Sequence, residues 1–120
     1  MKRARFLLLL MVLLATGLTA ADVNGKWKGS MQQGDRELTF DFKTDGDKLT
    51  GTVSGLIEKA LEIKDGKVQG DTISFWVMSE YQGQPVKLVY KGQASASEIR
   101  FSMGTEDGAW GTEVAAKRAS

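Results

Sequence analysis

The stretch Leu38-Thr39-Phe40-Asp41-Phe42-Lys43 alternates apolar and polar residues at every position. A period of two is typical of a β-strand that has one buried face and one face in water. The next segment, Lys43-Thr44-Asp45-Gly46-Asp47-Lys48, contains Asp45-Gly46. This pair predicts a tight hairpin turn, because glycine accepts the positive φ that such turns need.

The same pattern repeats from Asn24 to Arg118, where short alternating runs are separated by glycine-rich turns and no stretch has helical periodicity over several turns. Each run meets its neighbour through a short connection, so consecutive strands are expected to pair. The fold class is therefore all-β, and we expect an antiparallel meander that closes into an up-and-down barrel. Eight strands are predicted, at residues 25–32, 36–43, 48–54, 61–63, 72–80, 86–91, 98–103 and 109–117.

Two places are expected to interrupt the strands. Asp65-Gly66 is predicted to turn the chain after residues 61–63, so that Lys67-Val68-Gln69 pairs back briefly. Residues 81–85 are predicted to form a loop. This loop would hold Pro85, the only proline, outside any central strand, where its missing N–H does least harm.

The first 21 residues differ from the rest. A basic start that contains Lys2, Arg3 and Arg5 precedes an unbroken apolar run at residues 6–14, and small residues follow. This order is typical of a helical secretory signal peptide. The run is shorter than the roughly 20 residues that cross a bilayer comfortably, which favours cleavage over an uncleaved membrane anchor.

Cleavage is expected after Leu18-Thr19-Ala20 or Thr19-Ala20-Ala21, which have the small residues that such sites require. The predicted domains are then a signal peptide at 1–21 and one β-barrel domain at 22–120. We expect an exported protein, periplasmic or extracellular, with no stable membrane span after cleavage.

The amino-acid composition argues against several classes of function. Without Lys2, Arg3 and Arg5 the chain has 13 basic against 15 acidic residues, a net charge of about −2, which gives no reason to expect nucleic-acid binding. The sequence has no cysteine and no histidine. Serine–histidine and cysteine–histidine catalysis therefore cannot operate, and nearly all zinc and copper sites are excluded. We expect no enzyme activity, no catalytic residue, no cofactor and no metal.

Carboxylates are present but lie on the polar phase of the predicted strands. A solvated outer face explains them better than the paired carboxylates of a glycoside hydrolase, although a carboxylate-only hydrolase stays as a third hypothesis. The residues concerned are Glu37, Asp41, Glu62, Glu98 and Glu113. Asp45-Gly46-Asp47 lacks the further oxygen ligands and closing glutamate of a calcium loop, so a plain hairpin turn is the preferred interpretation.

Three short motifs resemble the calycin superfamily of up-and-down barrels. Asn24-Gly25-Lys26-Trp27 carries the Gly-x-Trp that opens lipocalins and avidin-like proteins, and residues 47–52 resemble the third-strand region of avidin-like barrels. Lys117 and Arg118 close the last predicted strand, where lipocalins place a basic residue over the tryptophan. The turn-rich segments 44–51 and 65–75 also resemble a group of small exported bacterial barrels of unknown function.

The lipocalin Thr-Asp-Tyr motif is absent, and the resemblance does not extend to biotin binding. It implies a small apolar ligand bound in the barrel mouth. In a closed meander the last strand pairs with the first, so Lys117 or Arg118 is expected beside Trp27.

Large inward side chains could line a ligand cavity or pack into a solid core, and both alternatives stay open. A buried Tyr90 hydroxyl is expected to find a hydrogen-bond partner. The predicted ligand-binding residues are Trp27, Phe40, Phe75, Tyr90, Phe101 and Trp110.

Trp76 and Met78 fall on the opposite face from Ile73, Phe75 and Val77. If those three residues point inward, an exterior apolar pair results, which suggests a contact surface for a protein partner. The alternatives are that a neighbour such as Val89 covers the pair, or that the register flips and places Trp76 inside.

Overall fold

The computed structural model describes residues 22–32 and 36–119, so the predicted signal peptide at 1–21 lies outside the described residues. Within these ranges the secondary structure is all β, and no helix has the length and apolar character needed to cross a membrane. The strands are β1 (Gly25–Met31), β2 (Glu37–Asp45), β3 (Lys48–Ser54), β4 (Leu61–Glu62), β5 (Lys64–Gln69), β6 (Thr72–Tyr81), β7 (Gln84–Ala94), β8 (Glu98–Thr105) and β9 (Gly111–Arg118).

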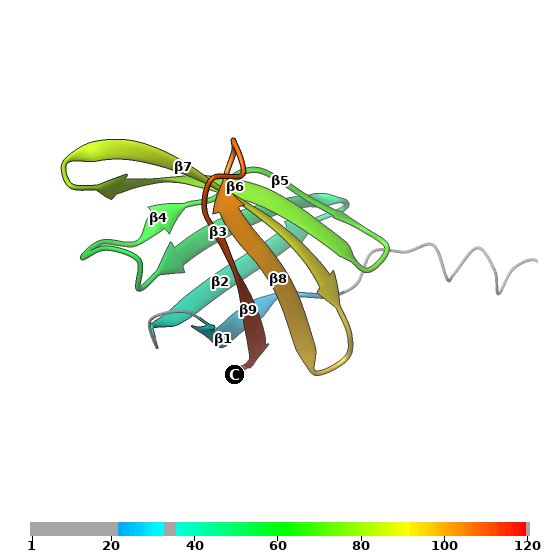
Figure 1. Cartoon of the computed structure of the whole chain (residues 1–120). Coiled ribbons are helices and arrows are strands. Elements are labelled where there is room, and N and C mark those ends of the chain that lie inside the picture. The colour runs from blue at the N-terminus through cyan, green and yellow to red at the C-terminus, as the bar shows by residue number, and fades with distance from the viewer. Residues whose placement is uncertain (1–21, 33–35, 120) are drawn as a thin grey trace, which may run out of the picture.

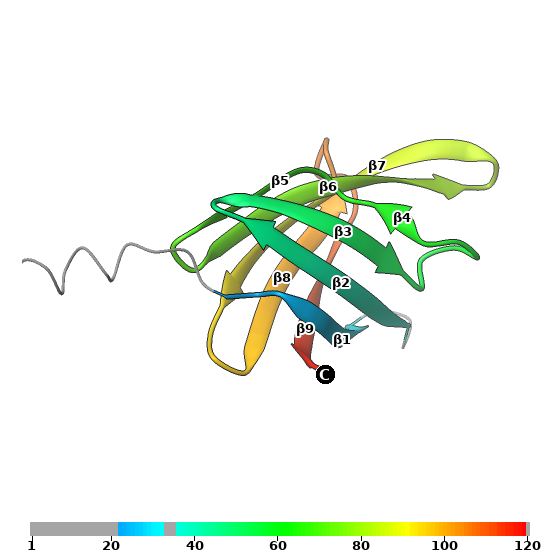
Figure 2. The same cartoon turned by 180° about the vertical axis from the view of Figure 1, so that it is seen from behind.

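The strands form one antiparallel sheet that closes on itself (Figure 1). Neighbours follow the order β2-β1-β9-β8-β7-β6-β5-β3, and a further pairing of β2 with β3 completes the ring. β1 lies between β2 and β9, so the first and last strands of the domain are hydrogen-bonded partners, as Figure 2 shows from behind. The predicted closed eight-stranded barrel is confirmed, with β4 and β5 sharing one position beside β3.

The predicted turn at Asp65-Gly66 is wrong. β4 and β5 both run antiparallel to β3, so the chain continues in one direction through both of them. The register of β5 against β6 shifts between Lys64 and Lys67, and Asp65 has a φ of 48°. One extra residue with a left-handed backbone makes a β-bulge, which bends the strand without reversing it.

The predicted loop at 81–85 is also wrong. β6 and β7 form a long hairpin, in which Tyr81 and Gln84 are partners across the two-residue turn Gln82-Gly83. Both turn residues have positive φ, 53° and 80°, as a type I′ turn requires. Both views show this hairpin projecting past the neighbouring strands (Figures 1 and 2).

Pro85 lies inside β7, opposite Glu80, rather than in a loop. In an antiparallel hairpin the pairs alternate between hydrogen-bonded and non-hydrogen-bonded, and the pair next to a two-residue turn is hydrogen-bonded. The backbone nitrogen of Pro85 therefore faces away from β6, toward an edge that β8 does not reach, since β8 pairs only from Leu88 onward. The missing N–H costs no ladder hydrogen bond there.

The barrel interior is packed with apolar side chains from every position of the ring. At its centre Phe40 stacks on Phe101 at a centroid distance of 5.0 Å, and Phe75 stacks on Tyr90 at 4.6 Å. Gly92 faces the Phe101 ring, which comes so close that a Cβ on Gly92 would lie 2.6 Å from a ring carbon. The glycine therefore makes room for the aromatic cluster.

Candidate functional site

Five of the six predicted ligand-binding residues form the packed core. Phe40, Phe75, Tyr90 and Phe101 contact one another as a cluster of rings. Trp27 is also fully buried, and its indole N–H donates a 3.0 Å hydrogen bond to the carbonyl of Val23. These side chains pack against each other and fill the centre of the barrel, so this region is a solid core.

Trp110, the sixth, was expected inside a strand that began at residue 109. β9 instead begins at Gly111, and Trp110 lies in the preceding turn with 39% of its surface exposed. Its backbone N–H donates to the Thr105 hydroxyl, which in turn donates to the carboxylate of Asp107 at 2.8 Å. The Ala109 N–H and the Thr105 hydroxyl lower the pKa of Asp107, so the turn that positions Trp110 is held by an ionised side chain.

An apolar cavity of about 540 Å³ lies at one end of the barrel. It is enclosed by the end of β1, the β6–β7 hairpin, the chain between β3 and β4, and the turn before β9. Of the predicted ligand-binding residues only Trp110 belongs to its wall. The lining residues are Met31, Arg36, Leu56, Ser79, Glu80, Tyr81, Val86, Leu88, Thr105 and Trp110. We call this space the mouth cavity.

Exposed apolar surface is concentrated at the mouth cavity. Three large apolar side chains of the described residues are exposed: Met78, Tyr81 and Trp110. Tyr81, with 68% of its surface exposed, and Trp110 both line the cavity. Exposed aromatic side chains around a concave apolar wall are a common feature of ligand sites.

One wall of the mouth cavity is fixed by Arg36. Its Nη1 donates to the carbonyl oxygens of Gly55 and Leu56, at 3.0 and 2.8 Å. These bonds hold the irregular chain between β3 and β4 against the start of β2. Leu56 packs against the core from this segment, so the arginine acts as a structural clamp and presents an apolar side chain to the cavity.

The strands bring two rows of cross-strand partners to this end of the barrel, one at the mouth cavity and one beneath it. Val77, Leu88 and Thr105 are successive cross-strand partners, and the last two line the cavity. Two residues further into the barrel on each strand is a deeper row of successive partners: Phe75, Tyr90, Met103 and Thr112. All four are buried, and none of them lines the cavity itself. We call this row, one step deeper in the barrel than the lining residues Leu88 and Thr105, the floor.

The floor contains polar atoms without partners. The hydroxyls of Tyr90 and Thr112 are both buried, and neither has a hydrogen-bond partner among the described residues. The expectation that a buried Tyr90 hydroxyl finds a partner is therefore wrong within this part of the chain. Desolvation raises the pKa of Tyr90 well above its ordinary value.

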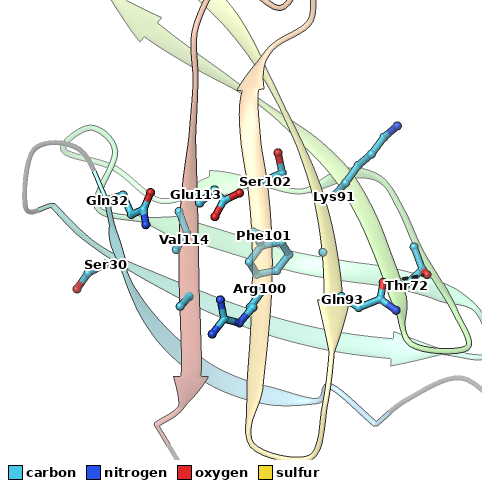
Figure 3. Close-up of a pocket in the computed structure, with 12 residues that line it drawn as sticks. Ser30, Gln32, Thr72, Lys91, Gln93, Arg100, Phe101, Ser102, Glu113 and Val114 are labelled. Carbon is cyan, nitrogen blue, oxygen red and sulfur yellow. Dashed lines mark hydrogen bonds between the residues drawn. The ribbon is translucent and has the colours of Figure 1, made fainter.

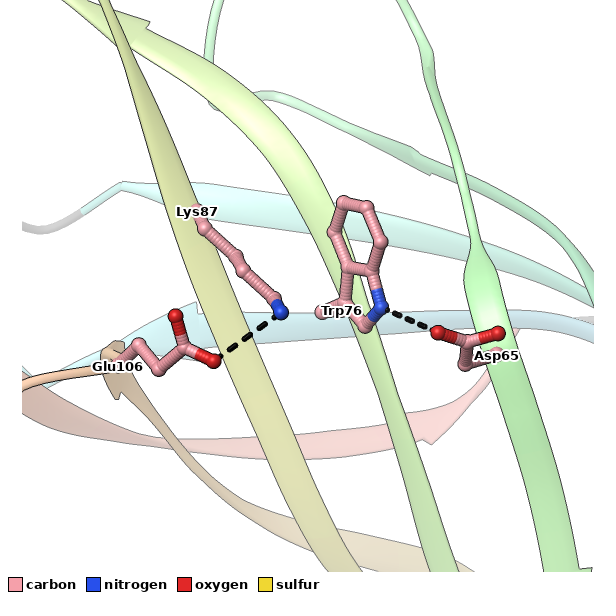
Figure 4. A network of polar contacts seen from close by, with 4 residues as sticks. All are labelled: Asp65, Trp76, Lys87 and Glu106. Atoms are coloured by element: carbon pink, nitrogen blue, oxygen red, sulfur yellow. Dashed lines mark hydrogen bonds and ion pairs between the residues drawn. The ribbon is translucent and has the colours of Figure 1, made fainter.

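The exterior pair Trp76 and Met78 points outward, and Ile73, Phe75 and Val77 point inward, so the unflipped register is confirmed. Trp76 lies beside Val89 in the ladder, as considered above. Its indole N–H donates to the Asp65 carboxylate at 2.8 Å, as Figure 4 shows. Trp76 is therefore half-buried and engaged, while Met78 is 45% exposed.

A basic side chain also packs on this tryptophan. Lys87 Nζ lies 4.5 Å from the Trp76 ring centroid and 3.1 Å from a carboxylate oxygen of Glu106 (Figure 4). The bulge at Asp65, the β6 strand and the turn after β8 thus meet through polar contacts around one indole. These contacts explain the position of Trp76 without a partner.

A second depression lies on the outer face of β7, β8 and β9 (Figure 3). It is lined by Lys91, Arg100 and Glu113 and by small residues such as Ser30 and Ser102. Lys91, Arg100 and Glu113 are all exposed, so the titratable lining residues that the structure describes are in contact with water. A solvated outer face accounts for it.

The carboxylates considered for hydrolysis are on the outside of the barrel. Glu37, Asp41, Glu62 and Glu113 are exposed, and Glu98 is half-buried beside Arg100 at 3.2 Å. Within residues 22–32 and 36–119, no three potential ligand side chains come together in a group that could hold a metal ion. Asp45 and Asp47 flank Gly46 in a two-residue hairpin, in agreement with the predicted turn.

Sequence reasoning missed most of the mouth cavity. Ser79, Val86 and Leu88 lie in strands that were predicted but were not assigned to a site, and Tyr81 lines the cavity because the β6–β7 hairpin is longer than expected. One signal was available: Ser79 continues the inward phase of Phe75 and Val77 as a polar residue, and it is 5% exposed. A polar residue on an otherwise apolar inward phase marks a place where the interior is not a simple core.

Comparison with known proteins adds no family to this geometry. No family model matches the chain, and neither a curated protein nor a solved structure matches it.

Proposed function

We propose that this chain is an exported, non-enzymatic β-barrel protein that binds a small apolar molecule in the mouth cavity. The observation that carries the proposal is the concentration of exposed aromatic surface, Tyr81 and Trp110, on the wall of that one cavity. Its volume of about 540 Å³ lies within the range of small-molecule sites, about 300–1,000 Å³. The lipocalin-like Gly-x-Trp opening adds support of a weaker kind.

The site is formed by Leu56, Val86, Leu88 and Trp110 in place of the residues predicted from the sequence, with Trp110 common to both sets. Apolar walls favour ligands through burial of hydrocarbon surface, worth roughly 25 cal/mol per Å². Absence of histidine and cysteine from the sequence supports binding over catalysis.

A fluorescence titration with the apolar dye N-phenyl-1-naphthylamine tests the proposal. We expect saturable binding by the protein and at least a tenfold loss of affinity in Val86→Trp, because the indole would fill the cavity. Val89→Trp is the matched control, since Val89 lies on the outer face of the same strand, and it should bind as the wild type does. Failure of the wild type to bind, or equal binding by Val86→Trp, would overturn the proposal.

Native mass spectrometry of protein purified from its own periplasm or medium gives a second readout. A co-purifying small molecule that disappears in Val86→Trp supports the proposal. The N-terminus of the same material tests export: we expect it at Ala21 or Asp22, and an N-terminus at Met1 would contradict signal-peptide cleavage.

The alternative function is an envelope protein-interaction module that uses Trp76 and Met78. The 45% exposure of Met78 favours a contact at this surface. The hydrogen bond from Trp76 to Asp65 and the packing of Lys87 on the ring satisfy the indole within the chain, so we rank this function second. Trp76→Lys should abolish capture of a protein partner if this alternative holds, and should leave dye binding unchanged if the mouth cavity is the site.

A further inference from the structure

Two hydroxyl groups in the floor of the mouth cavity lack hydrogen-bond partners among the described residues. Tyr90 is fully buried and Thr112 is 8% exposed. Leaving a buried polar group unpaired is costly, so most buried polar atoms in folded proteins are bonded. Two such atoms within one cross-strand row are therefore a feature that needs an explanation.

Packing alone does not require these hydroxyls. Valine has nearly the shape of threonine, and phenylalanine has that of tyrosine, so apolar residues would fill the same row without the cost of an unpaired group. Met103 lies between them, as the ladder partner of both Tyr90 and Thr112. Its unbranched thioether adapts to changed surroundings more readily than other core side chains, so it can move aside for a group that enters from above.

The floor lies directly under the cavity wall. On β7 and β8 the residues that line the cavity, Leu88 and Thr105, precede or follow the floor residues by two positions on the same inward face. The lining residue Ser79 adds a third buried polar side chain at this end of the barrel. The charged lining residues, Arg36 and Glu80, are exposed at the rim, and the floor itself carries no charge.

We infer that the ligand of the mouth cavity is a neutral amphiphile whose hydroxyl or carbonyl group enters first and bonds to the floor hydroxyls of Thr112 and Tyr90, with its apolar body against Leu88 and Trp110. This inference rests on the proposed function. A charged group is disfavoured there because burying an ion without a partner is far more costly than burying a neutral polar group.

The test compares two neutral compounds of similar shape, 2-naphthol and 2-methylnaphthalene, by isothermal titration calorimetry at pH 7. The wild type should bind 2-naphthol at least tenfold more tightly, because only this compound carries a hydrogen-bonding group. Equal affinities would overturn the inference and leave the proposed function intact. Binding of neither compound would overturn both.

Two variants locate the effect. Thr112→Val and Tyr90→Phe should each reduce the preference for 2-naphthol and leave the affinity for 2-methylnaphthalene within about twofold. Thr52→Val, on the half-exposed outer phase of β3, is the matched control and should keep the full preference. A preference that persists in both floor variants would place the polar contact elsewhere and overturn the inference. Urea unfolding of each variant shows whether it is folded. If one of the two floor variants does not fold, the binding preference of the other decides the outcome.

Discussion

The guanidinium of Arg118 lies over the indole of Trp27, with Cζ 4.3 Å from the ring centroid. The two residues are partners in the β1–β9 ladder, 91 positions apart in sequence, so their contact forms only when the ring of strands closes. Arg118 also donates to the carbonyls of Asn24 and Asp22, at 2.7 and 3.0 Å. One arginine thus joins the last strand to the segment that leads into the first.

Trp27→Ala should lower the free energy of unfolding by about 3–5 kcal/mol, because it removes a large buried aromatic side chain. Arg118→Ala should lower it by less, about 1 kcal/mol, since an exposed cation–π contact is worth only about 0.5–1 kcal/mol. Urea unfolding followed by circular dichroism measures both. An unchanged midpoint for Trp27→Ala would contradict the role of this contact in closing the barrel.

Removing the unpartnered floor hydroxyls should stabilise the protein without ligand. Tyr90→Phe and Thr112→Val each replace a buried unpaired group by an apolar one of similar shape, and each should raise the free energy of unfolding by about 1 kcal/mol. Chemical denaturation with matched m-values is the measurement. A decrease in stability would show that the hydroxyl has a bonding partner after all.

Alkaline pH should destabilise the fold through Tyr90. Burial raises the pKa of its hydroxyl above the ordinary value of 10.0, so the unfolded chain loses this proton first as pH rises. The folded state then binds more protons than the unfolded state, and stability falls with increasing pH. The contribution of Tyr90 is fully present below about pH 10 and is lost progressively above it, by up to about 1.4 kcal/mol per pH unit.

Unfolding free energies at pH 9 and pH 11 measure this effect. The loss between the two should be smaller in Tyr90→Phe than in the wild type. Tyr81→Phe is the matched control, because it makes the same substitution at an exposed tyrosine. Equal losses in all three proteins would mean that Tyr90 ionises no differently in the folded and unfolded chains.

Asp65 combines a left-handed backbone with a hydrogen bond from Trp76. Asp65→Ala removes the acceptor and places alanine at a φ of 48°, which costs a non-glycine residue roughly 1–2 kcal/mol, so a loss of about 1–2 kcal/mol is expected. Asp65→Asn keeps both an acceptor oxygen and tolerance of this conformation, and should be nearly neutral. Thermal unfolding of the two variants measures both changes in stability. Equal losses would contradict a contribution from the Trp76–Asp65 hydrogen bond.

Alternation along the chain was sufficient to predict the barrel, its inward face and the pairing of its ends. Phe40, Phe75 and Val77 point inward as their phase indicates, because a strand places successive side chains on opposite faces wherever it lies. The predicted two-residue turn at Gly46 was likewise local, since glycine adopts its positive φ without help from the rest of the fold.

The site depended on contacts between distant segments. Asp65-Gly66 and residues 81–85 contain turn-forming residues. Pairing of β5 with both β3 and β6 nevertheless made the first a bulge, and pairing of β6 with β7 extended the strands through part of the second. Trp110 followed an apolar pattern but lies at the rim, because Thr105 fixes the turn before β9.

Within the strands, residue order alone therefore determined which side chains face the interior, since that depends on the backbone geometry of each strand. Only the tertiary structure decided which of them pack solidly and which surround a cavity, because that depends on how far each strand extends beside its neighbours when the ring closes. The aromatic core residues and the residues that line the mouth cavity lie on the same inward face of their strands. They differ only in which side chains lie opposite them across the barrel.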